Sequence, residues 1–495
     1  MGITDMKNPS TDTLKVLFAA SEAEPFVKVG GLGDVAGTLP DALVSYFKKT
    51  PNLPTLDFRL FIPFHSKIPA SKFHIEKLCT IDVPTNRDPI PAHIYLNSDL
   101  TYPVYLIAGE PLPADGPVYD PNPVVDGKKF SFFSLAVLEY CRQNTWIPDI
   151  LHANDWHTAL LPHLIRERNE YKDLFSRTKT LLSVHNLPFM GGGSQAGLLE
   201  MGIKPSKDFR LPKWSKHMPL PMGLAASDRI LAVSPGYARE MLTPEYGCGL
   251  DGFLFTVTEK LGGILNGLDT TLWDPSHDPL LVKNYSSYTI AKRAKNKEEI
   301  LTRLGLEYEP RTPLIIMVTR IDQQKGIDIA LKALESIMER KFQLIILGVG
   351  DPTLEDACKA LEELYPERVR FLQRFDQTLS HQLYSSGDII LIPSRYEPCG
   401  LTQMISMRYG CVPVARNTGG LSDTIIDTSP DNGQTGFLFQ ETTPESCARA
   451  IERALNMFIN QDIWLRIQKN GMKMDFSWKK SAEKYANEYL SLRKQ

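Results

Sequence analysis

The sequence has no apolar segment long enough to cross a membrane. No run approaches the roughly 18 residues that a transmembrane helix needs. Residues 1–13 are polar and carry Asp5 and Asp12, unlike a secretory signal or an Arg-rich transit peptide. There is no C-x-x-C pair, and the 7 cysteines are scattered, which is typical of a reduced compartment. We therefore expect a cytoplasmic protein that does not bind membranes.

The sequence also lacks an excess of one charge and an evident metal-binding motif. Lys and Arg number 55 against 58 acidic residues, so no global field recruits nucleic acid. There is no Asp-x-Asp motif to hold a divalent ion beside a phosphate. The spacing of His152, His157 and His163 does not place them on one helix face. We expect no metal and no cofactor; if phosphates bind, Lys and Arg must neutralise them.

The 495 residues, 42% of them hydrophobic, instead predict a globular protein of two or three α/β domains. Short apolar runs alternate with helical stretches, which is typical of parallel sheets buried on both faces. In the first half the expected strands are 14–20, 58–63, 104–107, 150–153 and 180–184, with helices at 33–47 and 130–143. In the second half the expected strands are 313–319, 342–347, 369–372, 389–393 and 412–415, with helices at 327–340, 353–364 and 401–409.

The boundary between the halves is predicted at a segment rich in turn-forming residues, ILNGLDTTLWDP. We predict a first Rossmann-like domain at 1–265, a hinge at 266–275, a second Rossmann-like domain at 276–478, and an amphipathic terminal helix at 479–495. Ligands of such folds bind beyond the carboxyl ends of the strands, so the expected site is a cleft between the two domains.

Three loops at expected strand exits suit an anion. The first, Lys28 to Asp34, contains Gly30, Gly31 and Gly33, but its spacing is not that of a dinucleotide fingerprint. The second carries Arg320 and Lys325, and the third is NTGGLSDT at 417–424. Each loop alone is ambiguous, because the glycines could form a mere turn and the cations could be solvated. Their distribution over both halves favours binding of a diphosphate.

Other polar residues at strand exits are candidates for sugar contacts. Glu397 follows one expected strand, and the neighbouring Cys399 is either a nucleophile or, more simply, a small packing residue. Asp155 and His185 follow two strands of the first half. Capping of the next helix is the competing interpretation for Asp155.

At these residues the sequence resembles the bacterial glycogen synthase and plant starch synthase family. The resemblance covers essentially the whole chain, in order: FVKVGGLGDVAGTLP, ILHANDWHTAL, SVHNLPFMG, TPEYGCGLDGFL, ILNGLDTTLWDP, VTRIDQQKGID, SRYEPCGLTQM and NTGGLSDT. It implies the two-domain GT-B fold, with the terminal helix crossing back onto the first domain. It also implies transfer of glucose from ADP-glucose, or UDP-glucose in some members, to O4 of the non-reducing end of an α-1,4-glucan or malto-oligosaccharide, with retention of configuration.

The resemblance also implies roles for individual residues. By motif position, the catalytic group comprises Glu397, Lys325, Arg320 and His185. The nucleotide-sugar group comprises Lys28, Gly30, Gly31, Gly33, Asp34, Asn266, Phe375, Cys399, Gly400, Leu401, Thr418, Gly419, Gly420 and Leu421. The rim that contacts the substrates comprises Asp155, His157 and Asn186.

The sequence departs from the wider pattern at two positions. The second glutamate of the GT-B clan is replaced by Ile405, with Gln403 nearby, and the synthase branch commonly lacks that glutamate. The base-stacking position, often a tyrosine, is Phe375, which keeps an aromatic face without the hydroxyl. Three alternatives stay open: a Rossmann oxidoreductase, a glucan-binding homologue without turnover, and a GT-B enzyme for another sugar.

Overall fold

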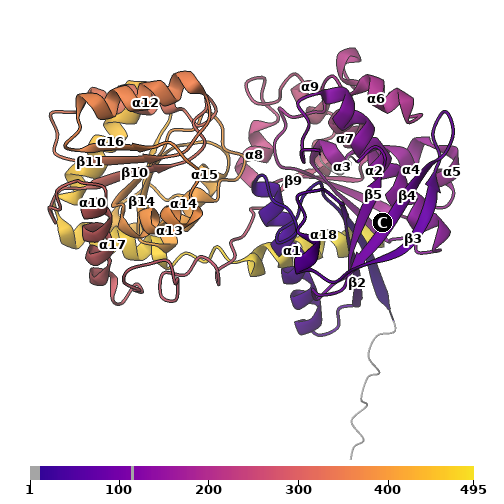
Figure 1. The fold of residues 1–495 in the computed structure, drawn as a ribbon, viewed down its shortest axis with the longest axis horizontal. Helices are drawn as coiled ribbons and strands as arrows, with labels where there is room; N and C mark the ends of the chain where they lie inside the picture. The colour runs from indigo at the N-terminus through magenta and orange to yellow at the C-terminus, as the bar shows by residue number, and fades with distance from the viewer. Residues whose placement is uncertain (1–11, 113–115) are drawn as a thin grey trace, which may run out of the picture. The chain divides into compact units, whose positions relative to one another are not determined.

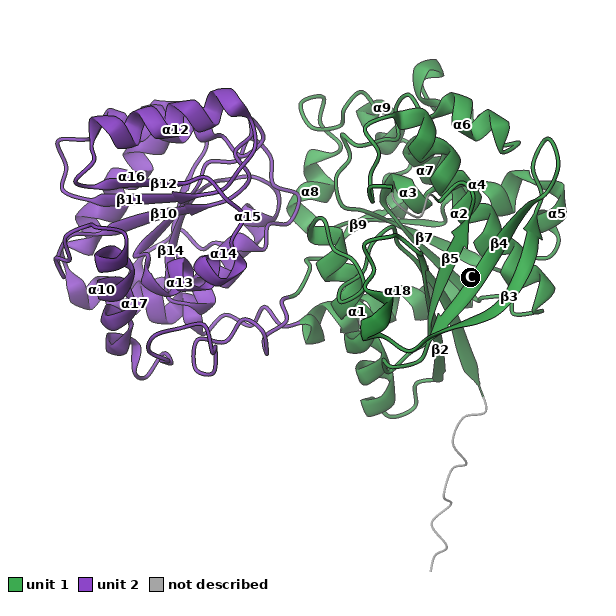
Figure 2. Cartoon of the chain, in the orientation of Figure 1, with its two compact units in different colours: residues 1–267, 478–495 green, residues 268–477 purple. Residues whose placement is uncertain are grey.

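The computed structural model describes residues 12–112 and 116–495. The polar start that argues against a targeting segment falls largely on residues 1–11 and lies outside this range. The described chain forms two compact units (Figure 2). The first ends at Gly267 and is completed by residues 478–495, and the second spans Leu268–Ser477.

The first unit is built on a nine-stranded sheet with the strand order β3-β4-β5-β2-β1-β6-β7-β8-β9. The central strand, with sequence TLKVLFA, is buried along most of its length and pairs in parallel with both neighbours. The strands are β1 (Thr13–Ala19), β2 (Thr55–Pro63), β3 (Ile75–Val83), β4 (Ile90–Asn97), β5 (Val104–Gly109), β6 (Ile150–Asn154), β7 (Lys179–Val184), β8 (Arg229–Ala232) and β9 (Leu261–Gly263).

One edge of this sheet is antiparallel, which the sequence analysis did not predict. β4 pairs antiparallel with β3 and with β5, whereas β5 joins β2 in parallel. β3 has mostly half-buried and exposed residues, so it lacks the apolar run that marks the inner strands. The inner strands were found because both of their faces are buried.

The helices of the first unit include two that are far apart in sequence and packed side by side. α18 lies against α1 and the sheet, with Trp478, Ala482, Tyr485, Tyr489 and Leu492 in the core (Figure 1). The predicted return of the terminal helix to the first unit is therefore confirmed. The helices are α1 (Gly31–Lys49), α2 (Pro123–Gln143), α3 (Asp155–Thr158), α4 (Leu160–Glu167), α5 (Asn169–Lys172), α6 (Gln195–Glu200), α7 (Pro219–Ala226), α8 (Pro235–Glu240), α9 (Asp251–Phe255) and α18 (Trp478–Lys494).

The second unit contains a six-stranded, fully parallel sheet with the order β12-β11-β10-β13-β14-β15. Its inner strands are runs of buried Ile, Leu and Val, which favour a sheet covered on both faces. The strands are β10 (Leu314–Val318), β11 (Gln343–Leu347), β12 (Val369–Leu372), β13 (Ile389–Ile392), β14 (Val412–Arg416) and β15 (Phe437–Phe439).

Helices cover this sheet, and one of them ends well before its predicted last residue. α11 ends at Glu335 instead of Arg340, and the buried Ile337 and Met338 pack from the turns that follow it. The helices are α10 (Ala294–Arg303), α11 (Ile327–Glu335), α12 (Pro352–Leu364), α13 (Gln377–Ser386), α14 (Thr402–Arg408), α15 (Gly419–Thr424), α16 (Pro444–Phe458) and α17 (Gln461–Met472).

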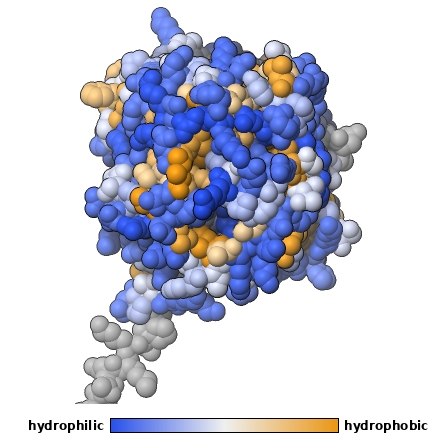
Figure 3. All heavy atoms as spheres, turned by 90° about the vertical axis from the view of Figure 1, so that its left-hand side faces the viewer, coloured by the Kyte–Doolittle hydropathy of each residue, from blue (hydrophilic) through white to orange (hydrophobic). Residues whose placement is uncertain are grey.

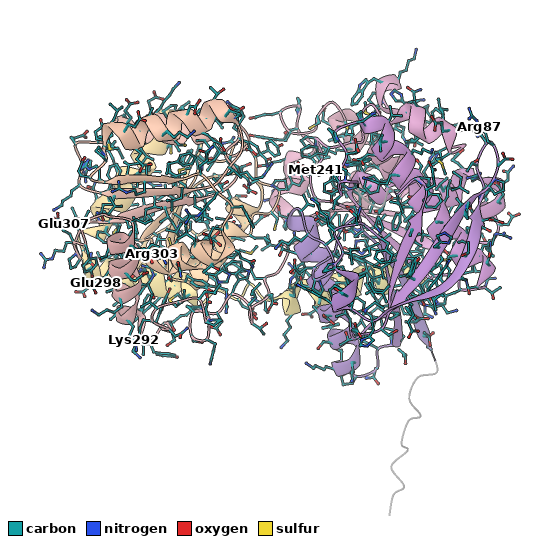
Figure 4. All side chains as sticks on the ribbon, viewed as in Figure 1. Arg87, Met241, Lys292, Glu298, Arg303 and Glu307 are labelled. Carbon is teal, nitrogen blue, oxygen red and sulfur yellow. The ribbon has the colours of Figure 1, made fainter. Side chains whose placement is uncertain are left out.

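The face of the second unit that Figure 3 shows is mainly hydrophilic, with small groups of hydrophobic residues (Figure 3). Lys292, Glu298 and Arg303 project around α10 on this side (Figure 4). Within residues 12–112 and 116–495, none of the helices combines the length and apolar character needed to span a bilayer.

Candidate active site

The glycine loop of the first unit joins β1 to α1. Gly30 and Gly31 are exposed, and a Cβ on Gly31 would meet no atom within 4 Å, so the backbone is open to a ligand. The ammonium group of Lys28 lies 2.6 Å from Oδ1 of Asp34. Burial raises the pKa of the Asp34 carboxyl, and the charge of Lys28 opposes that shift. The predicted cation is therefore held at the start of α1.

A buried acid beneath this loop was missed by the sequence analysis. Glu22 is only 2% exposed, and its carboxylate accepts hydrogen bonds from the backbone N–H groups of Val29 and Gly30. Burial raises the pKa of the Glu22 carboxyl, although these two hydrogen bonds lower it. Glu22 therefore sets the conformation of the loop and occupies two of its amides. The sequence does carry a signal for Glu22, because it is a polar residue just after an apolar strand. The same criterion located the candidate residues after other strands.

Asp155 stands where β6 ends and links that strand to the exit of β7. Its Oδ1 accepts hydrogen bonds from the backbone N–H of His185, at 2.7 Å, and of Asn186, at 3.3 Å. Its φ of 54° is a left-handed conformation that a non-glycine residue adopts at a cost. The helix-capping alternative is wrong, because Asp155 is itself the first residue of α3 and its carboxylate binds another loop. Burial raises the pKa of this carboxyl to about 7.

The hydrogen bonds around His185 fix which ring nitrogen carries the proton. Asn154 donates through Nδ2 to the carbonyl of Ala19, so its Oδ1 is an acceptor that faces Nε2 of His185 at 3.0 Å. Nε2 therefore carries the proton and Nδ1 keeps a lone pair. Burial lowers the pKa of the His185 imidazole to about 3, which keeps it neutral near pH 7. Such a ring can accept a hydrogen bond from a hydroxyl group.

His157 lies in an aromatic cluster and does not join this network. Its ring centroid is 4.2 Å from Trp156, 4.7 Å from Phe130 and 4.8 Å from Tyr119. Burial lowers the pKa of its imidazole well below the usual range. Its Nδ1 is buried and has no hydrogen-bond partner within the described residues, and the same holds for Oδ1 of Asn186 and of Asn266.

In the second unit, the exits of two neighbouring strands bring a cation and an acid together. β10 pairs with β13, and the loops that follow them carry Lys325 and Glu397. The Lys325 ammonium donates to Oε2 of Glu397 at 2.6 Å, and the hydroxyl of Ser394 donates to the same oxygen at 2.9 Å. Both charged side chains are largely buried, so the ammonium is held in a defined place.

Arg320 belongs to the same loop but is more exposed. It lies two residues beyond the end of β10 and pairs with Oδ2 of Asp322 at 3.0 Å. Oδ1 of Asp322 accepts from the backbone N–H of Lys325 at 2.9 Å. Asp322, which the sequence analysis passed over within VTRIDQQKGID, therefore organises both predicted cations. Gly326 is required here, since its φ is 68° and a Cβ would lie 2.1 Å from the carbonyl oxygen of Pro393.

The loops after β13 and β14 touch each other. The backbone N–H of Gly420 donates to the carbonyl of Glu397 at 3.0 Å, and a Cβ on Gly420 would lie 1.9 Å from the carbonyl oxygen of Cys399. The side chains of Cys399, Thr418 and Leu421 are buried, so contacts of these loops with a ligand would come mainly from the backbone. Phe375, in contrast, is 88% exposed in the loop between β12 and α13.

The structure thus gathers most of the predicted residues into three clusters at strand exits. The first unit joins Lys28 to Asp34, and separately Asp155 to His185 and Asn186. The second unit joins Lys325 to Glu397 and to the glycine loop. Among the described residues, no group of three or more His, Cys, Asp or Glu side chains could hold a metal ion.

A cavity of about 740 Å³ lies at the other end of the second sheet, near the amino ends of β10 and β11. Arg311, Arg340 and Phe458 are among its lining residues, and none of the predicted site residues lines it. The chemistry therefore concentrates at the carboxyl ends of the strands.

Comparison with known proteins supports this arrangement. Residues 15–256 match the family model for the starch synthase catalytic domain, and residues 305–471 match that for glycosyl transferases group 1. A glycogen synthase of Clostridium perfringens is 37% identical over 486 residues, covering 97% of this chain and 98% of the relative. A glycogen synthase of Streptococcus pneumoniae is 34% identical over 489 residues, covering 97% of this chain and 100% of the relative.

Two solved structures share the fold. The catalytic domain of starch synthase IV from Arabidopsis thaliana, bound to ADP and acarbose, has a TM-score of 0.86 and 30% identity, covering 98% of this chain and 100% of its own. A sucrose-phosphate synthase from Thermosynechococcus elongatus, with a TM-score of 0.60 and 18% identity over 97% of this chain and 99% of its own, shares the fold alone. The oxidoreductase alternative finds no support in these relatives. With three strand-exit clusters on two α/β units and relatives of this kind over nearly the whole chain, the chain belongs to the glycogen and starch synthase family of GT-B glucosyltransferases.

Proposed function

We propose that this glucosyltransferase moves glucose from ADP-glucose to O4 of the non-reducing end of an α-1,4-glucan, with retention of the α configuration. The observation that carries the proposal is the 2.6 Å contact between Lys325 and Glu397 at adjacent strand exits. The starch synthase relative that was solved with ADP and acarbose supports a nucleotide and a glucan as ligands of the same fold.

The cations supply the electrostatic part of the reaction. As the anomeric bond breaks, negative charge grows on the departing diphosphate, and a positive group that is already in place stabilises it most effectively. Glu397, which also accepts a hydrogen bond from Ser394, holds the Lys325 ammonium, and Asp322 holds the Arg320 guanidinium. Lys28 supplies a third positive charge from the first unit. We therefore propose that no metal ion is needed.

Retention follows without a protein nucleophile. The departing phosphate takes the proton of the acceptor hydroxyl, and attack occurs on the face that the phosphate leaves. This route needs no pair of carboxylates, unlike that of ordinary glycosidases. His185 accepts a hydrogen bond from a sugar hydroxyl through Nδ1, and Asp155 orients it through the backbone. Asn186 and His157 belong to the substrate rim.

A donor competition assay tests the proposal. ADP-, UDP- and GDP-glucose, each labelled in glucose, are offered with a malto-oligosaccharide acceptor. We expect label to enter the polymer fastest from ADP-glucose, and the new bonds to be cleaved by an α-1,4-specific hydrolase. A preference for UDP-glucose would overturn the donor assignment. Absence of label from every donor would favour a binding protein without turnover.

A further inference from the structure

A buried amide side chain joins the two loops that follow β13 and β14. Gln403, in α14, has no exposed surface, and its Nε2 donates to the carbonyl oxygens of Cys399 at 3.0 Å and Gly400 at 2.9 Å. Nε2 also lies 3.1 Å from the hydroxyl of Thr424. That hydroxyl donates to the carbonyl of Gly420 at 2.6 Å, so one amide connects the turn at 399–400 to the glycine loop.

The orientation of this amide follows from its surroundings. Two carbonyl oxygens, which only accept hydrogen bonds, face the nitrogen position, and the Thr424 hydroxyl already uses its proton on Gly420. An amide oxygen in that position would face acceptors alone. Oε1 therefore lies on the other side, where it is buried without a partner among the described residues. The side chain keeps an unsatisfied oxygen in order to place its two N–H groups.

The direction of these hydrogen bonds determines where the turn presents its own donors. In a trans peptide unit the C=O and N–H groups point in opposite directions. Because the carbonyls of Cys399 and Gly400 point toward Gln403, the N–H groups of Gly400 and Leu401 point away from it. Neither N–H donates a hydrogen bond within the described chain. The left-handed φ of 70° at Gly400 permits this arrangement.

We propose that Gln403 is a positioning residue, which fixes the N–H groups of Gly400 and Leu401 as two donors to the oxygens of the glucosyl diphosphate. The proposal rests on the function proposed above. Thr424 keeps the glycine loop aligned with this turn, and Gly420 allows the two loops to approach closely, since a Cβ there would lie 1.9 Å from the carbonyl oxygen of Cys399. Gln403 acts through the backbone and does not touch the substrate.

The experiment compares Q403M, which keeps the length but lacks N–H donors, with Q434M as a matched control. Gln434 lies in the same unit, is only 2% exposed, donates through Nε2 to the carbonyl of Gly436 at 3.2 Å, and also has a buried unpaired Oε1. Both substitutions remove a buried amide, but only one adjoins the turn. Kcat and KM for donor and acceptor are measured, together with ADP affinity by calorimetry and thermal stability.

We expect Q403M to lower kcat on the order of tenfold to a hundredfold and to weaken ADP binding several-fold, with an unchanged acceptor KM. Q434M should keep wild-type kinetics at a similar loss of thermal stability. Wild-type kcat and ADP affinity in folded Q403M, or an equal kinetic loss in Q434M, would overturn the proposal. A wild-type chain that binds ADP but transfers no glucose would contradict the proposed function alone, because the ADP affinities still test Gln403. A wild-type chain that binds no ADP would overturn both.

A second variant, Q403E, separates donation from packing and remains informative if Q403M does not fold. A carboxylate has no donor, whereas a protonated carboxyl has one O–H. The activity of Q403E relative to wild type should therefore rise as the pH is lowered, whereas that of Q403M should stay flat. A Q403E/wild-type ratio that does not change with pH would contradict the role of the N–H groups.

Discussion

The carboxylate of Asp155 accepts a 2.7 Å hydrogen bond from the backbone N–H of His185, so the ends of β6 and β7 are joined by one buried acid. This contact orients a neutral imidazole whose Nδ1 is left as an acceptor. The acid lies in a left-handed conformation and in surroundings that disfavour its ionised form. Such a combination of strain and a shifted pKa is typical of a functional site.

The buried Asp155 should make the stability of the protein depend on pH. Its pKa is about 7 in the folded state and about 3.9 in an unfolded chain. The folded state therefore holds the proton more tightly, and the stability that this provides is full below pH 4 and is lost as the pH rises toward 7. In D155N the amide oxygen can still accept from His185, and this pH dependence should disappear. Urea unfolding of both proteins between pH 5 and 8 measures the difference.

The same substitution should separate stability from activity. At pH 8 we expect D155N to be more stable than wild type, because it carries no buried charge, and yet to turn over more slowly. A D155N protein that is less stable than wild type at pH 8 would show that the ionised carboxylate is well compensated.

Loss of the Lys325–Glu397 pair should affect turnover far more than donor affinity. We expect K325A and E397A to lower kcat on the order of a hundredfold or more, since removal of one preorganised electrostatic group typically costs about 3–4 kcal/mol. A suitable control is K297M, which breaks another buried 2.6 Å ion pair, Lys297 with Asp388, away from the strand exits. This control should lose stability but keep its kinetics. A change confined to donor KM in K325A would contradict the assignment.

Replacement of Glu22 should loosen the glycine loop. In E22Q the one remaining oxygen can take the place of Oε2, which accepts from Val29 and Gly30, but the new NH₂ group at the place of Oε1 would lie 3.2 Å from the N–H of Gly30, itself a donor. We expect a rise in donor KM equivalent to about 1–3 kcal/mol, the cost of a buried group left unsatisfied. The matched control is E24Q, which replaces an exposed glutamate two residues away. Steady-state kinetics of E22Q and E24Q provide the comparison. Equal donor KM values for the two variants would remove Glu22 from the site.

The exposed ring of Phe375 should contribute to nucleotide binding and not to folding. Stacking of a base on an aromatic ring is worth about 1–3 kcal/mol, so F375A should weaken ADP binding by roughly ten- to a hundredfold. F375Y should keep the affinity because it keeps the aromatic face. Calorimetric titration with ADP measures this, and the thermal midpoint should stay unchanged because the side chain is 88% exposed. Unchanged ADP affinity in F375A would place the base elsewhere.

Activity should not require a divalent ion. If Lys28, Arg320 and Lys325 neutralise the diphosphate, EDTA should leave the rate of glucose transfer unchanged. Addition of Mg²⁺ after EDTA serves as the second arm. An EDTA-sensitive activity that Mg²⁺ restores would count against the role of these cations.

The inner strands of both sheets could be predicted from sequence because they are apolar runs bounded by polar or glycine residues. β12 begins and ends at the predicted residues, and the predicted bounds of β11 and β13 are off by one residue. The β3–β4 edge could not, since most residues of β3 are exposed and β4 mixes buried with half-buried residues, so the apolar run of a strand buried on both faces is missing. The end of α11 was missed because Ile337 and Met338 continue an apolar pattern that packing satisfies from a turn.

The chemistry of the site was predictable only in part. Polar residues after buried strands located Lys325, Glu397, Asp155 and His185 in the chain. Asp322, which accepts from the backbone N–H of Lys325, was not evident, because a single acid within a loop has no periodic signal. Glu22 was missed although it closely follows β1. The contact of Asp155 with the next strand exit, in place of a helix cap, depends on the pairing of β6 with β7, which the linear sequence does not encode locally.

The position of α18 has a consequence for synthesis on the ribosome. Residues 478–495 supply Trp478, Tyr485 and Tyr489 to the core of the first unit, and Tyr489 bonds to the buried His152 at 2.7 Å. A nascent chain therefore cannot close that core until residues 478–495 have been made, whereas the second unit has its whole sequence earlier. The first unit therefore matures after the second, although most of its residues are synthesised before it, so loss of residues 478–495 would damage the first unit.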